Sequence, residues 1–243
     1  MKLAVIADIH GNSLALAAVL DAIAREGPLE IVHLGDACNG PIDPVGTAAL
    51  LRSVAAQHVR GNGDRMVGDP DASPVLRSAR FARERLSAAD AAWVGGWSQT
   101  VDGDDWLACH GSPRSDVEYL LEEVAPRGVV LRDPGDIAAR LGPTSARLIL
   151  CGHTHLARVV ALPDGRWVVN PGSVGLPAYA DDQPYPHKME AGAPHARYAT
   201  LERRRDDWHV ELRSVVYDWE RAGRMAEENG WLEWARAVRT GRV

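Results

Sequence analysis

The chain has 243 residues, of which 46% are hydrophobic and 25% charged, a composition typical of a soluble globular protein and enough to bury a substantial core. Its formal net charge of −6 argues against a broad nucleic-acid-binding surface, and no apolar run reaches the roughly 20 residues that span a membrane. The three cysteines are few and odd in number, so they do not form the paired set of a disulfide framework. Such sparse cysteines suit a reducing compartment, and we therefore expect a cytoplasmic protein.

The opening of the chain alternates predicted strands and helices. Residues 2–8 form a nearly continuous apolar run that ends in an acid, which is typical of a strand buried on both faces. The predicted elements then follow as a helix over 13–26, a strand over 30–36, a helix over 44–56 and a strand over 58–62. This β-α-β-α-β order predicts a sheet with helices on its faces.

The remainder of the chain mixes helices with hairpins. We expect helix over 70–95 and 133–141, a hairpin over 98–111 that turns at Asp102-Gly103, strands over 146–155, 157–173 and 196–215, and an amphipathic helix over 218–238 broken near Gly230. Residues 177–194 contain four prolines and show no periodicity. A loop of that length inside a compact domain is usually functional or mobile, so we predict a specificity lid there, with a disordered surface loop as the alternative.

Side chains that bind metals follow several of the predicted strands. They are Asp8, His10, Asp36, Asn62, His110, His153 and His155. The carboxyl ends of strands in open α/β sheets are where ligands bind, and carboxylate with imidazole suits Mn, Fe, Zn or Ni. Any one of these short motifs alone is weak evidence for a metal site; Asn-Gly, for example, marks a turn far more often than a ligand. The whole series in order predicts a dimetal centre of the kind that clamps phosphoryl oxygens between ions about 3.5–4 Å apart.

The stretches "DIHGN", "GD", "GN-x-D", "CHGS", "GHTH" and "NPGSVG" together carry a family resemblance. Over about residues 1–215 the chain resembles the calcineurin-like metallophosphoesterase superfamily, and within it the small bacterial and archaeal phosphodiesterase branch. The resemblance implies an α/β (α+β) fold, a four-layer α-β-β-α sandwich of two mixed β-sheets flanked by helices. We expect one metallophosphoesterase domain over 1–217 and a C-terminal helical extension over 218–243 packed on it.

The resemblance also implies which residues hold the ions. One ion would be bound by Asp8, His10, Asp36 and His155, and the other by Asp36, Asn62, His110 and His153. Both would be divalent transition-metal ions, with Mn²⁺ expected first and Fe, Zn, Ni or Mg as alternatives, and a hydroxide bridging them would attack phosphorus. The implied catalytic residues are Asp36, Asn62, His110 and Asp64.

The chain departs from the family pattern at Gly63. Most members carry a histidine there, which is often assigned as general acid to the leaving oxygen. A positioned acid is typically worth about 10²–10⁴-fold in rate, so its absence should matter least for aryl esters, nucleoside phosphodiesters and anhydrides. Asp64 would then cap the next turn or pair with Arg60 or Arg65, and His187 is a candidate for a second histidine entering from the 177–194 segment.

The predicted substrate-binding residues are Asn12, Asn39, Tyr179 and His187, with a helix N-cap as the alternative role of Asn12. The expected substrate is a phosphate-ester small molecule or a nucleotide, and the expected activity is that of a phosphodiesterase. A phosphoprotein or nucleoside polyphosphate phosphatase is the first alternative. A non-catalytic binding scaffold, as in a retromer subunit of the superfamily, is the second. The Trp-rich terminal helix either packs on the sandwich or forms a homodimer contact.

Overall fold

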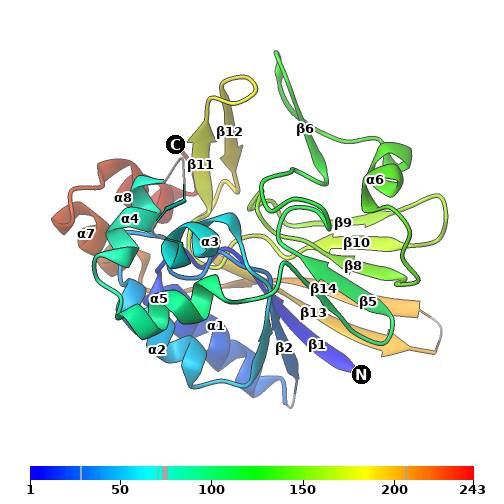
Figure 1. The fold of residues 1–243 in the computed structure, drawn as a ribbon, viewed down its shortest axis with the longest axis horizontal. Helices are drawn as coiled ribbons and strands as arrows, with labels where there is room; N and C mark the ends of the chain where they lie inside the picture. The colour runs from blue at the N-terminus through cyan, green and yellow to red at the C-terminus, as the bar shows by residue number, and fades with distance from the viewer. Residues whose placement is uncertain (28, 70, 73–75, 206) are drawn as a thin grey trace.

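The computed structural model describes residues 1–27, 29–69, 71–72, 76–205 and 207–243. Two five-stranded mixed sheets form the centre of the molecule, with strand orders β14-β13-β1-β2-β3 and β4-β5-β8-β10-β9 (Figure 1). The first sheet contains β1 (Lys2–Ile6), β2 (Glu30–His33), β3 (Ala56–His58), β13 (Ala196–Arg204) and β14 (Asp207–Val215). The second contains β4 (Thr100–Asp102), β5 (Trp106–Cys109), β8 (Leu148–Leu150), β9 (Arg158–Ala161) and β10 (Trp167–Asn170).

The two sheets have the same plan. β1, β2 and β3 run parallel, as do β5, β8 and β10, and antiparallel strands complete the first sheet at one edge and the second sheet at both. The expected hairpin over 98–111 is present as β4 and β5. Because the parallel strands of a sheet point the same way, the loops that leave their carboxyl ends gather at one edge, and this is where ligand-type side chains were predicted.

Alternation along β1 shows how the layers are built. Leu3 and Val5 pack between the sheets in the cluster that contains Trp106 of β5, whereas Ala4 and Ile6 pack outward against helices. This is the period of two expected for a pleated strand that is buried on both faces. The near-continuous apolar run at the start of the sequence is therefore explained by two different cores.

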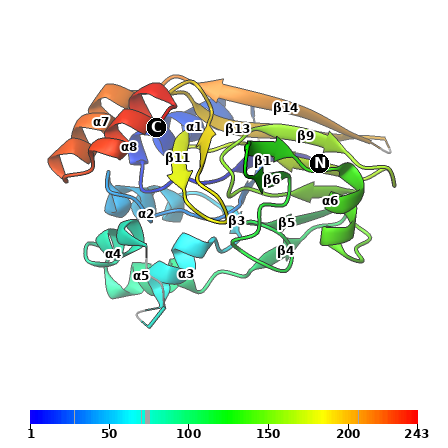
Figure 2. The same ribbon diagram turned by 90° about the horizontal axis from the view of Figure 1, so that it is seen from above.

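Helices cover both outer faces of the sandwich. The first sheet carries α1 (Ser13–Arg25), α2 (Pro44–Arg52), α3 (Asn62–Gly68), α4 (Arg77–Arg83), α5 (Ala88–Gly95), α7 (Trp219–Glu228) and α8 (Leu232–Thr240). The second sheet carries α6 (Pro134–Leu141), which Figure 1 shows on the opposite side of the molecule. The four-layer α-β-β-α sandwich is thereby confirmed (Figure 2). Within the part of the chain described, no helix is long and apolar enough to cross a membrane.

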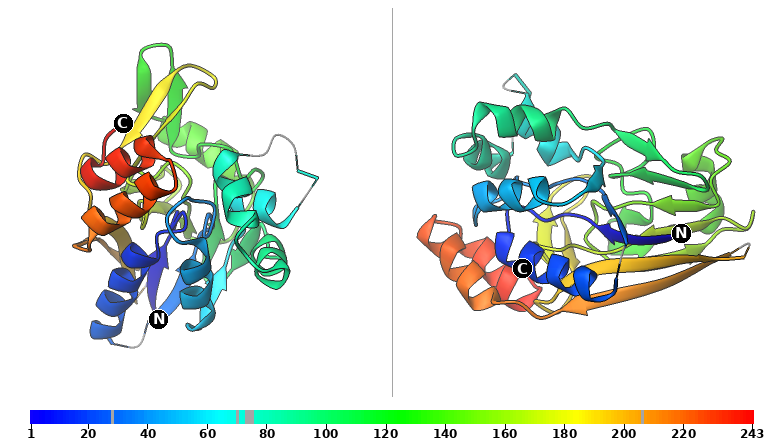
Figure 3. Two further views of the ribbon diagram at one scale, coloured as in Figure 1. Left: turned by 90° about the vertical axis from the view of Figure 1, so that its left-hand side faces the viewer. Right: turned by 90° about the horizontal axis from the view of Figure 1, so that it is seen from below.

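Two hairpins extend from the sandwich and lie side by side (Figures 1 and 3). One consists of β6 (Glu122–Ala125) and β7 (Gly128–Leu131), and the other of β11 (Ala178–Asp181) and β12 (His187–Glu190). The prediction that 177–194 is a loop was therefore wrong, because the segment contains the two paired strands β11 and β12. Its prolines lie outside the paired residues of β11 and β12, so they leave the ladder between them intact.

Other differences concern where elements end. The helix predicted over 44–56 ends at Arg52, and the strand predicted over 58–62 ends at His58, so that Asn62 instead begins α3. The helical stretch predicted over 70–95 contains α4 and α5, while residues 70 and 73–75 lie outside the described residues. The terminal helix is divided as expected at Gly230, whose φ of +81° favours glycine.

Candidate metal centre and its cavity

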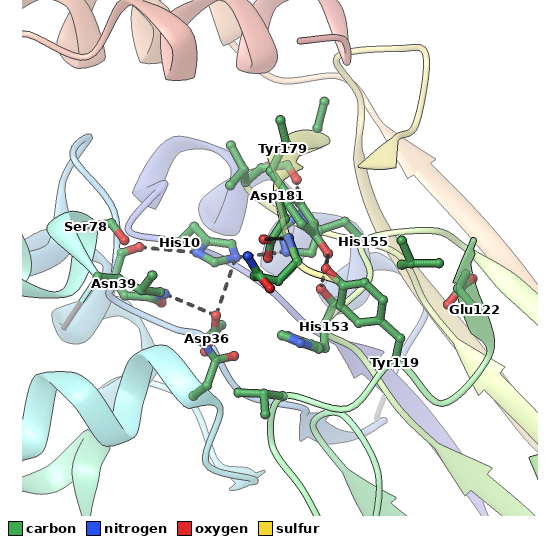
Figure 4. A pocket seen from close by; sticks show the side chains of 18 of the residues that line it. His10, Asp36, Asn39, Ser78, Tyr119, Glu122, His153, His155, Tyr179 and Asp181 are labelled. Atoms are coloured by element: carbon green, nitrogen blue, oxygen red, sulfur yellow. Dashed lines mark hydrogen bonds and ion pairs between the residues drawn. The ribbon is translucent and has the colours of Figure 1, made fainter. Parts of the chain in front are cut away.

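The predicted ligands all lie just beyond the carboxyl ends of parallel strands. Asp8 and His10 follow β1, Asp36 follows β2, and Asn62 begins the helix that follows β3. His110 follows β5 in the second sheet, and His153 and His155 follow β8. Figure 4 shows side chains from both sheets converging on one pocket. The sandwich thus brings together residues that are up to 147 positions apart, from Asp8 to His155.

The donor atoms are close enough to hold ions. Two groups each have ligand atoms within 4.8 Å of one another, Asp8 with His10 and His155, and Asp8 with Asp36 and His110. Nε2 of His10 is 3.0 Å from Nε2 of His155. Two imidazole nitrogens at right angles around one ion, each about 2.1 Å from it, have about this separation. The positions of these side chains therefore suit the binding of a divalent ion.

Asp36 lies between two sets of donors. Its Oδ2 is 3.7 Å from His10 Nε2, and its Oδ1 is 3.6 Å from His110 Nε2. His110 Nε2 is in turn 3.1 Å from the Oδ1 atom of Asn62. Each oxygen of the carboxylate thus faces a different histidine, which is the arrangement that a carboxylate shared by two ions requires.

Three of the histidines have the same tautomer imposed on them. In each, Nδ1 lies against a main-chain carbonyl, which can only accept a hydrogen bond, so Nδ1 carries the proton and Nε2 keeps its lone pair. The distances are 2.7 Å from His110 to Leu34, 2.6 Å from His155 to Leu176 and 3.3 Å from His10 to Asn39. This contact of the second ring nitrogen is the usual way in which a metal-binding histidine is oriented.

The backbone at the ligands has an unusual conformation. Six non-glycine residues of the described chain have positive φ. Five of them are predicted ligands: Asp8, His10, Asp36, His153 and His155, with φ between 51° and 69°. Such conformations cost of order 1–3 kcal/mol each and cluster at functional sites. The fold holds these side chains in place against a local conformational preference.

Burial and mutual charge set the protonation of the ligands. Burial lowers the pKa values of His10 and His153 to about 4, so both rings are neutral at neutral pH, as a ligand must be. Burial opposes ionisation of Asp8 and Asp36, but the surrounding histidines hold both carboxyl pKa values below their usual range. Burial likewise opposes the charged form of His110, yet Asp36, Asp8 and the Leu34 carbonyl raise its pKa. The site is a pair of buried anions that favours cationic partners.

Asp64 is a scaffold residue in this structure. Its carboxylate accepts hydrogen bonds from the main-chain N–H groups of Asp36, Ala37 and Gly61 at 2.7, 2.9 and 2.9 Å. It is fully buried, and burial with the nearby Asp36 raises its pKa to about 7 while the N–H donors oppose that rise. The predicted capping interaction is thus present through Gly61, and Asp64 joins the two loops that carry Asp36 and Asn62.

Asn39 occupies the space beside Gly63. A Cβ at position 63 would be 1.9 Å from Asn39 Nδ2 and 2.1 Å from its Cγ. The amide donates from Nδ2 to Asp36 Oδ2 at 3.1 Å, and the N–H of Gly63 donates to Asp36 Oδ1 at 2.7 Å. Glycine is therefore the residue that allows Asn39 to reach the carboxylate.

Asn12 has its side chain fully engaged elsewhere. Its Oδ1 accepts from the N–H of Ala15 at 3.1 Å, and its Nδ2 donates to the Gly175 carbonyl and the Tyr217 hydroxyl. The residue is completely buried. The alternative role that the sequence allowed, a helix N-cap, is the one that the structure shows.

A cavity of about 1030 Å³ opens from the ligands toward the two hairpins. His10, Asp36, Asn39, Asn62, His153 and His155 line its inner end. Tyr179 of β11 and Tyr119 line it beside the metal ligands, as Figure 4 shows. His187, by contrast, is only 6% exposed and lies behind Tyr119, with its Nε2 3.3 Å from the Tyr119 hydroxyl.

Two aromatic residues that line this cavity close to the ligands, Tyr119 and Trp234, were not predicted as site residues. Tyr119 precedes β6 in a stretch with no motif, and nothing local marks it. Trp234 was assigned to the packing face of the terminal helix, yet its ring lies edge-on to His10 with centroids 5.7 Å apart, and it lines the cavity. A tryptophan on a helix gives the same apolar signal whether it packs in a core or beside a site.

Comparison with known proteins agrees with this geometry. The family model for the calcineurin-like phosphoesterase superfamily domain matches residues 1–187. A metallophosphoesterase of Sphaerobacter thermophilus superposes with a TM-score of 0.73 and 25% identity over 98% of each chain. A hypothetical protein of Pyrococcus horikoshii OT3 gives a TM-score of 0.74 and 19% identity, covering 99% of this chain and 98% of that one.

A curated relative extends the comparison in sequence. An uncharacterized protein of Methanocaldococcus jannaschii is 25% identical over 258 residues, which cover 96% of this chain and 94% of the relative. These matches include nearly the whole chain, so the hairpins and the C-terminal helices belong to an architecture that other proteins share.

Proposed function

The chain belongs to the calcineurin-like phosphoesterase superfamily, a family of phosphoric-ester hydrolases, and from that premise we propose that it is a phosphodiesterase with two divalent metal ions. The observation that carries the proposal is the position of Asp36. Its two carboxylate oxygens face His10 and His110, which belong to different donor sets. A single-ion site would not need a carboxylate placed in this way.

Each donor set has a defined membership. The first consists of Asp8, His10, Asp36 and His155, and the second of Asp36, Asn62, His110 and His153. When bound, the two ions would polarise the phosphoryl group and activate a water molecule for attack on phosphorus. Oxygen and imidazole donors without thiolate suit Mn²⁺, Fe, Zn²⁺ or Ni²⁺, and we propose Mn²⁺ as the first ion to test.

The protein's own groups orient these donors. The Leu34, Leu176 and Asn39 carbonyls fix three histidine rings. Hydrogen bonds from Gly63 N–H and from the Asn39 amide hold the two oxygens of Asp36. A donor set that is already oriented loses little conformational entropy when it binds metal ions, and this favours tight binding.

The shape of the cavity supports a diester substrate. A volume of about 1030 Å³ is at the upper end of the range of small-molecule sites and much exceeds what a phosphate group needs. Apolar side chains, among them Leu76, Val117, Val124 and Trp234, also line it. A second ester group of apolar or aromatic character can therefore be buried there. The alternative substrates, a nucleoside polyphosphate or a phosphoprotein, are separated from diesters by the assay below.

The test combines a hydrolysis assay with metal analysis. Purified protein is loaded with Mn²⁺ and assayed with bis(p-nitrophenyl) phosphate, p-nitrophenyl phosphate, a dinucleoside polyphosphate and a phosphopeptide. Asp36→Asn should lower bound metal from two ions to one or none and reduce diester hydrolysis at least 10³-fold, on the order of what loss of a charge-stabilising group costs. Asp181→Asn, a carboxylate in the same cavity but exposed and outside the donor sets, should retain both ions.

Two results would overturn the proposal. One is wild-type protein that binds no transition metal. The other is Asp36→Asn protein that hydrolyses the diester at the wild-type rate. Preference for the polyphosphate or the phosphopeptide over both nitrophenyl esters would transfer the activity to the corresponding alternative.

A further inference from the structure

The two hairpins bring three polar aromatic side chains together beside the metal ligands. Tyr119 lies just before β6, Tyr179 lies in β11 and His187 in β12. The hairpins lie against each other through β7 and β12 (Figures 1 and 3). The meeting of these residues thus depends on two separate segments and is not a property of either hairpin alone.

A chain of hydrogen bonds connects the three side chains. The Tyr179 hydroxyl donates to the Tyr119 hydroxyl at 2.9 Å, and the Tyr119 oxygen is 3.3 Å from Nε2 of His187. His187 Nδ1 lies 2.7 Å from the Tyr185 carbonyl. Because a carbonyl only accepts, Nδ1 of the neutral ring carries the proton and Nε2 accepts from Tyr119. Tyr119 therefore donates to His187, and the one hydroxyl hydrogen of Tyr179 is shared between the Tyr119 oxygen and the His153 carbonyl.

The chain ends at the metal ligands. The Tyr179 hydroxyl is also 3.2 Å from the His153 carbonyl, and its ring centroid is 4.7 Å from that of His155. The Tyr119 ring centroid is 5.1 Å from that of His153. Figure 4 shows both tyrosines extending over these histidines, and both line the cavity. A phosphate ester held at the ligands would lie within reach of this hydroxyl pair.

We propose that the Tyr119 hydroxyl donates a hydrogen bond to the ester oxygen that leaves the substrate, with Tyr179 and His187 as the residues that position it. The inference rests on the proposed phosphodiesterase function and adds the group that stabilises the leaving oxygen. The covalent O–H bond of Tyr119 stays intact in this role, because the hydroxyl only donates a hydrogen bond toward the negative charge that develops on the leaving oxygen.

The geometry suits this role. At 3.3 Å the bond from Tyr119 to His187 is long for a hydroxyl donor, whose usual distance is about 2.7–2.8 Å. It is the contact most easily exchanged for a substrate oxygen. The shorter bond from Tyr179 remains and polarises the Tyr119 hydroxyl further. Burial raises the pKa of Tyr119 to about 12, so the hydroxyl keeps its proton as a donor at neutral pH.

The position also complements the inner end of the cavity. There, the Asn39 amide fills the space in front of Gly63, and its Nδ2 is already bonded to Asp36. Its Oδ1 is an acceptor and can give no hydrogen bond to an oxygen of the substrate. Tyr119 is a donor with an exchangeable bond on the cavity wall, outside the two metal donor sets.

The test compares two leaving groups. Methyl p-nitrophenyl phosphate has a good leaving group and methyl phenyl phosphate a poorer one, which needs more stabilisation of its oxygen. Tyr119→Phe should lower kcat for the phenyl ester by about 10²-fold, the loss typical for one donor to a developing oxyanion. It should lower kcat for the nitrophenyl ester by less than about tenfold and leave KM for both nearly unchanged. Tyr185→Phe is the matched control, since it removes an exposed phenol hydroxyl on the same hairpin and keeps the carbonyl that binds His187.

His187 supplies a second, independent readout. His187→Gln retains a carbonyl acceptor for Tyr119 and should keep most of the phenyl-ester activity, whereas His187→Leu, which removes the acceptor that orients the hydroxyl before the substrate binds, should lose part of it, but less than Tyr119→Phe does. In the metal-free protein, ¹⁵N chemical shifts should show His187 protonated at Nδ1, with the Nε2 shift changed by Tyr119→Phe and not by Tyr185→Phe. Equal loss for both esters, or an Nε2 shift that ignores Tyr119→Phe, would overturn the inference. Wild-type protein inactive on every diester would instead refute the proposed function.

Discussion

Replacing Gly63 with alanine tests whether the side chain of Asn39 occupies the space beside this glycine. The backbone of Gly63 has no positive φ and lies in α3, so alanine is acceptable there apart from its neighbours. The new Cβ would be 1.9 Å from Asn39 Nδ2, so the amide has to rotate away and break its 3.1 Å bond to Asp36. Overpacking costs about 1–3 kcal/mol and a hydrogen bond to a charged group about 1.5–3 kcal/mol.

We therefore expect Gly63→Ala to lower the free energy of unfolding by about 2.5–6 kcal/mol. The pair Asn39→Ala with Gly63→Ala removes the clash, so the double variant should differ from Asn39→Ala alone by less than about 0.5 kcal/mol. Urea unfolding followed by tryptophan fluorescence measures each value, with a chelator present so that metal loss does not contribute. Gly96→Ala is the control, because Gly96 is exposed and helical in its backbone, and it should change stability by less than about 1 kcal/mol.

Additive effects of the two substitutions, within about 0.5 kcal/mol, would refute the reasoning. They would mean that the Asn39 amide does not occupy the space beside Gly63. If the coupling is found, the Gly63→His variant should keep most of its free energy of unfolding only when Asn39→Ala is also present.

Three further predictions concern groups around the site. Burial lowers the pKa of His58 to about 4 from an ordinary 6.5. As pH falls, the unfolded chain therefore binds this proton before the folded protein does, and the folded protein loses stability below about pH 7. His58→Phe should reduce the stability lost between pH 8 and pH 5, measured by urea unfolding, by about 2 kcal/mol. Asp64→Asn should cost at least about 2 kcal/mol, because an amide cannot accept all three main-chain N–H bonds, and an unchanged urea midpoint would contradict it. Asn12→Ala should lower the thermal midpoint through about 1–2 kcal/mol of lost capping and leave KM for diesters at the wild-type value, whereas a large rise in KM would restore the substrate-binding role.

The parallel strands made the ligand positions predictable. Asp8 and Asp36 each end an apolar run, and sheets of this class collect such residues at one edge. The sequence alone did not decide which donors share an ion; that came from the family resemblance, and the distances around Asp36 support it. A local pattern predicts where a strand ends, and only tertiary structure shows which strand ends are neighbours.

The wall of the cavity could be predicted only in part, for the same reason. Tyr179 was predicted from its segment, but Tyr119 and Trp234 come from two other segments that meet it only in the folded chain. The β6–β7 hairpin gave no usable signal, because its strands have four residues each and, apart from the buried Glu122, are partly or fully exposed. Short exposed strands need not alternate polar and apolar residues, so the pattern that identifies a buried strand is missing.

The strained backbone of the ligands indicates how the site is kept ready for metal. Left-handed residues at about 1–3 kcal/mol each would relax unless other contacts fixed them. Here the loops after β1 and β2 continue to pair beyond the strands: Asp8 N–H donates to the Gly35 carbonyl, His10 N–H to that of Asp36 and Gly11 N–H to that of Ala37, at 3.0, 3.0 and 2.8 Å. These bonds join main-chain groups to one another, so the fold itself meets part of the cost of arranging the ligands. Metal should therefore enter a site whose backbone is already formed, and its binding free energy can go to coordination instead of to ordering the chain.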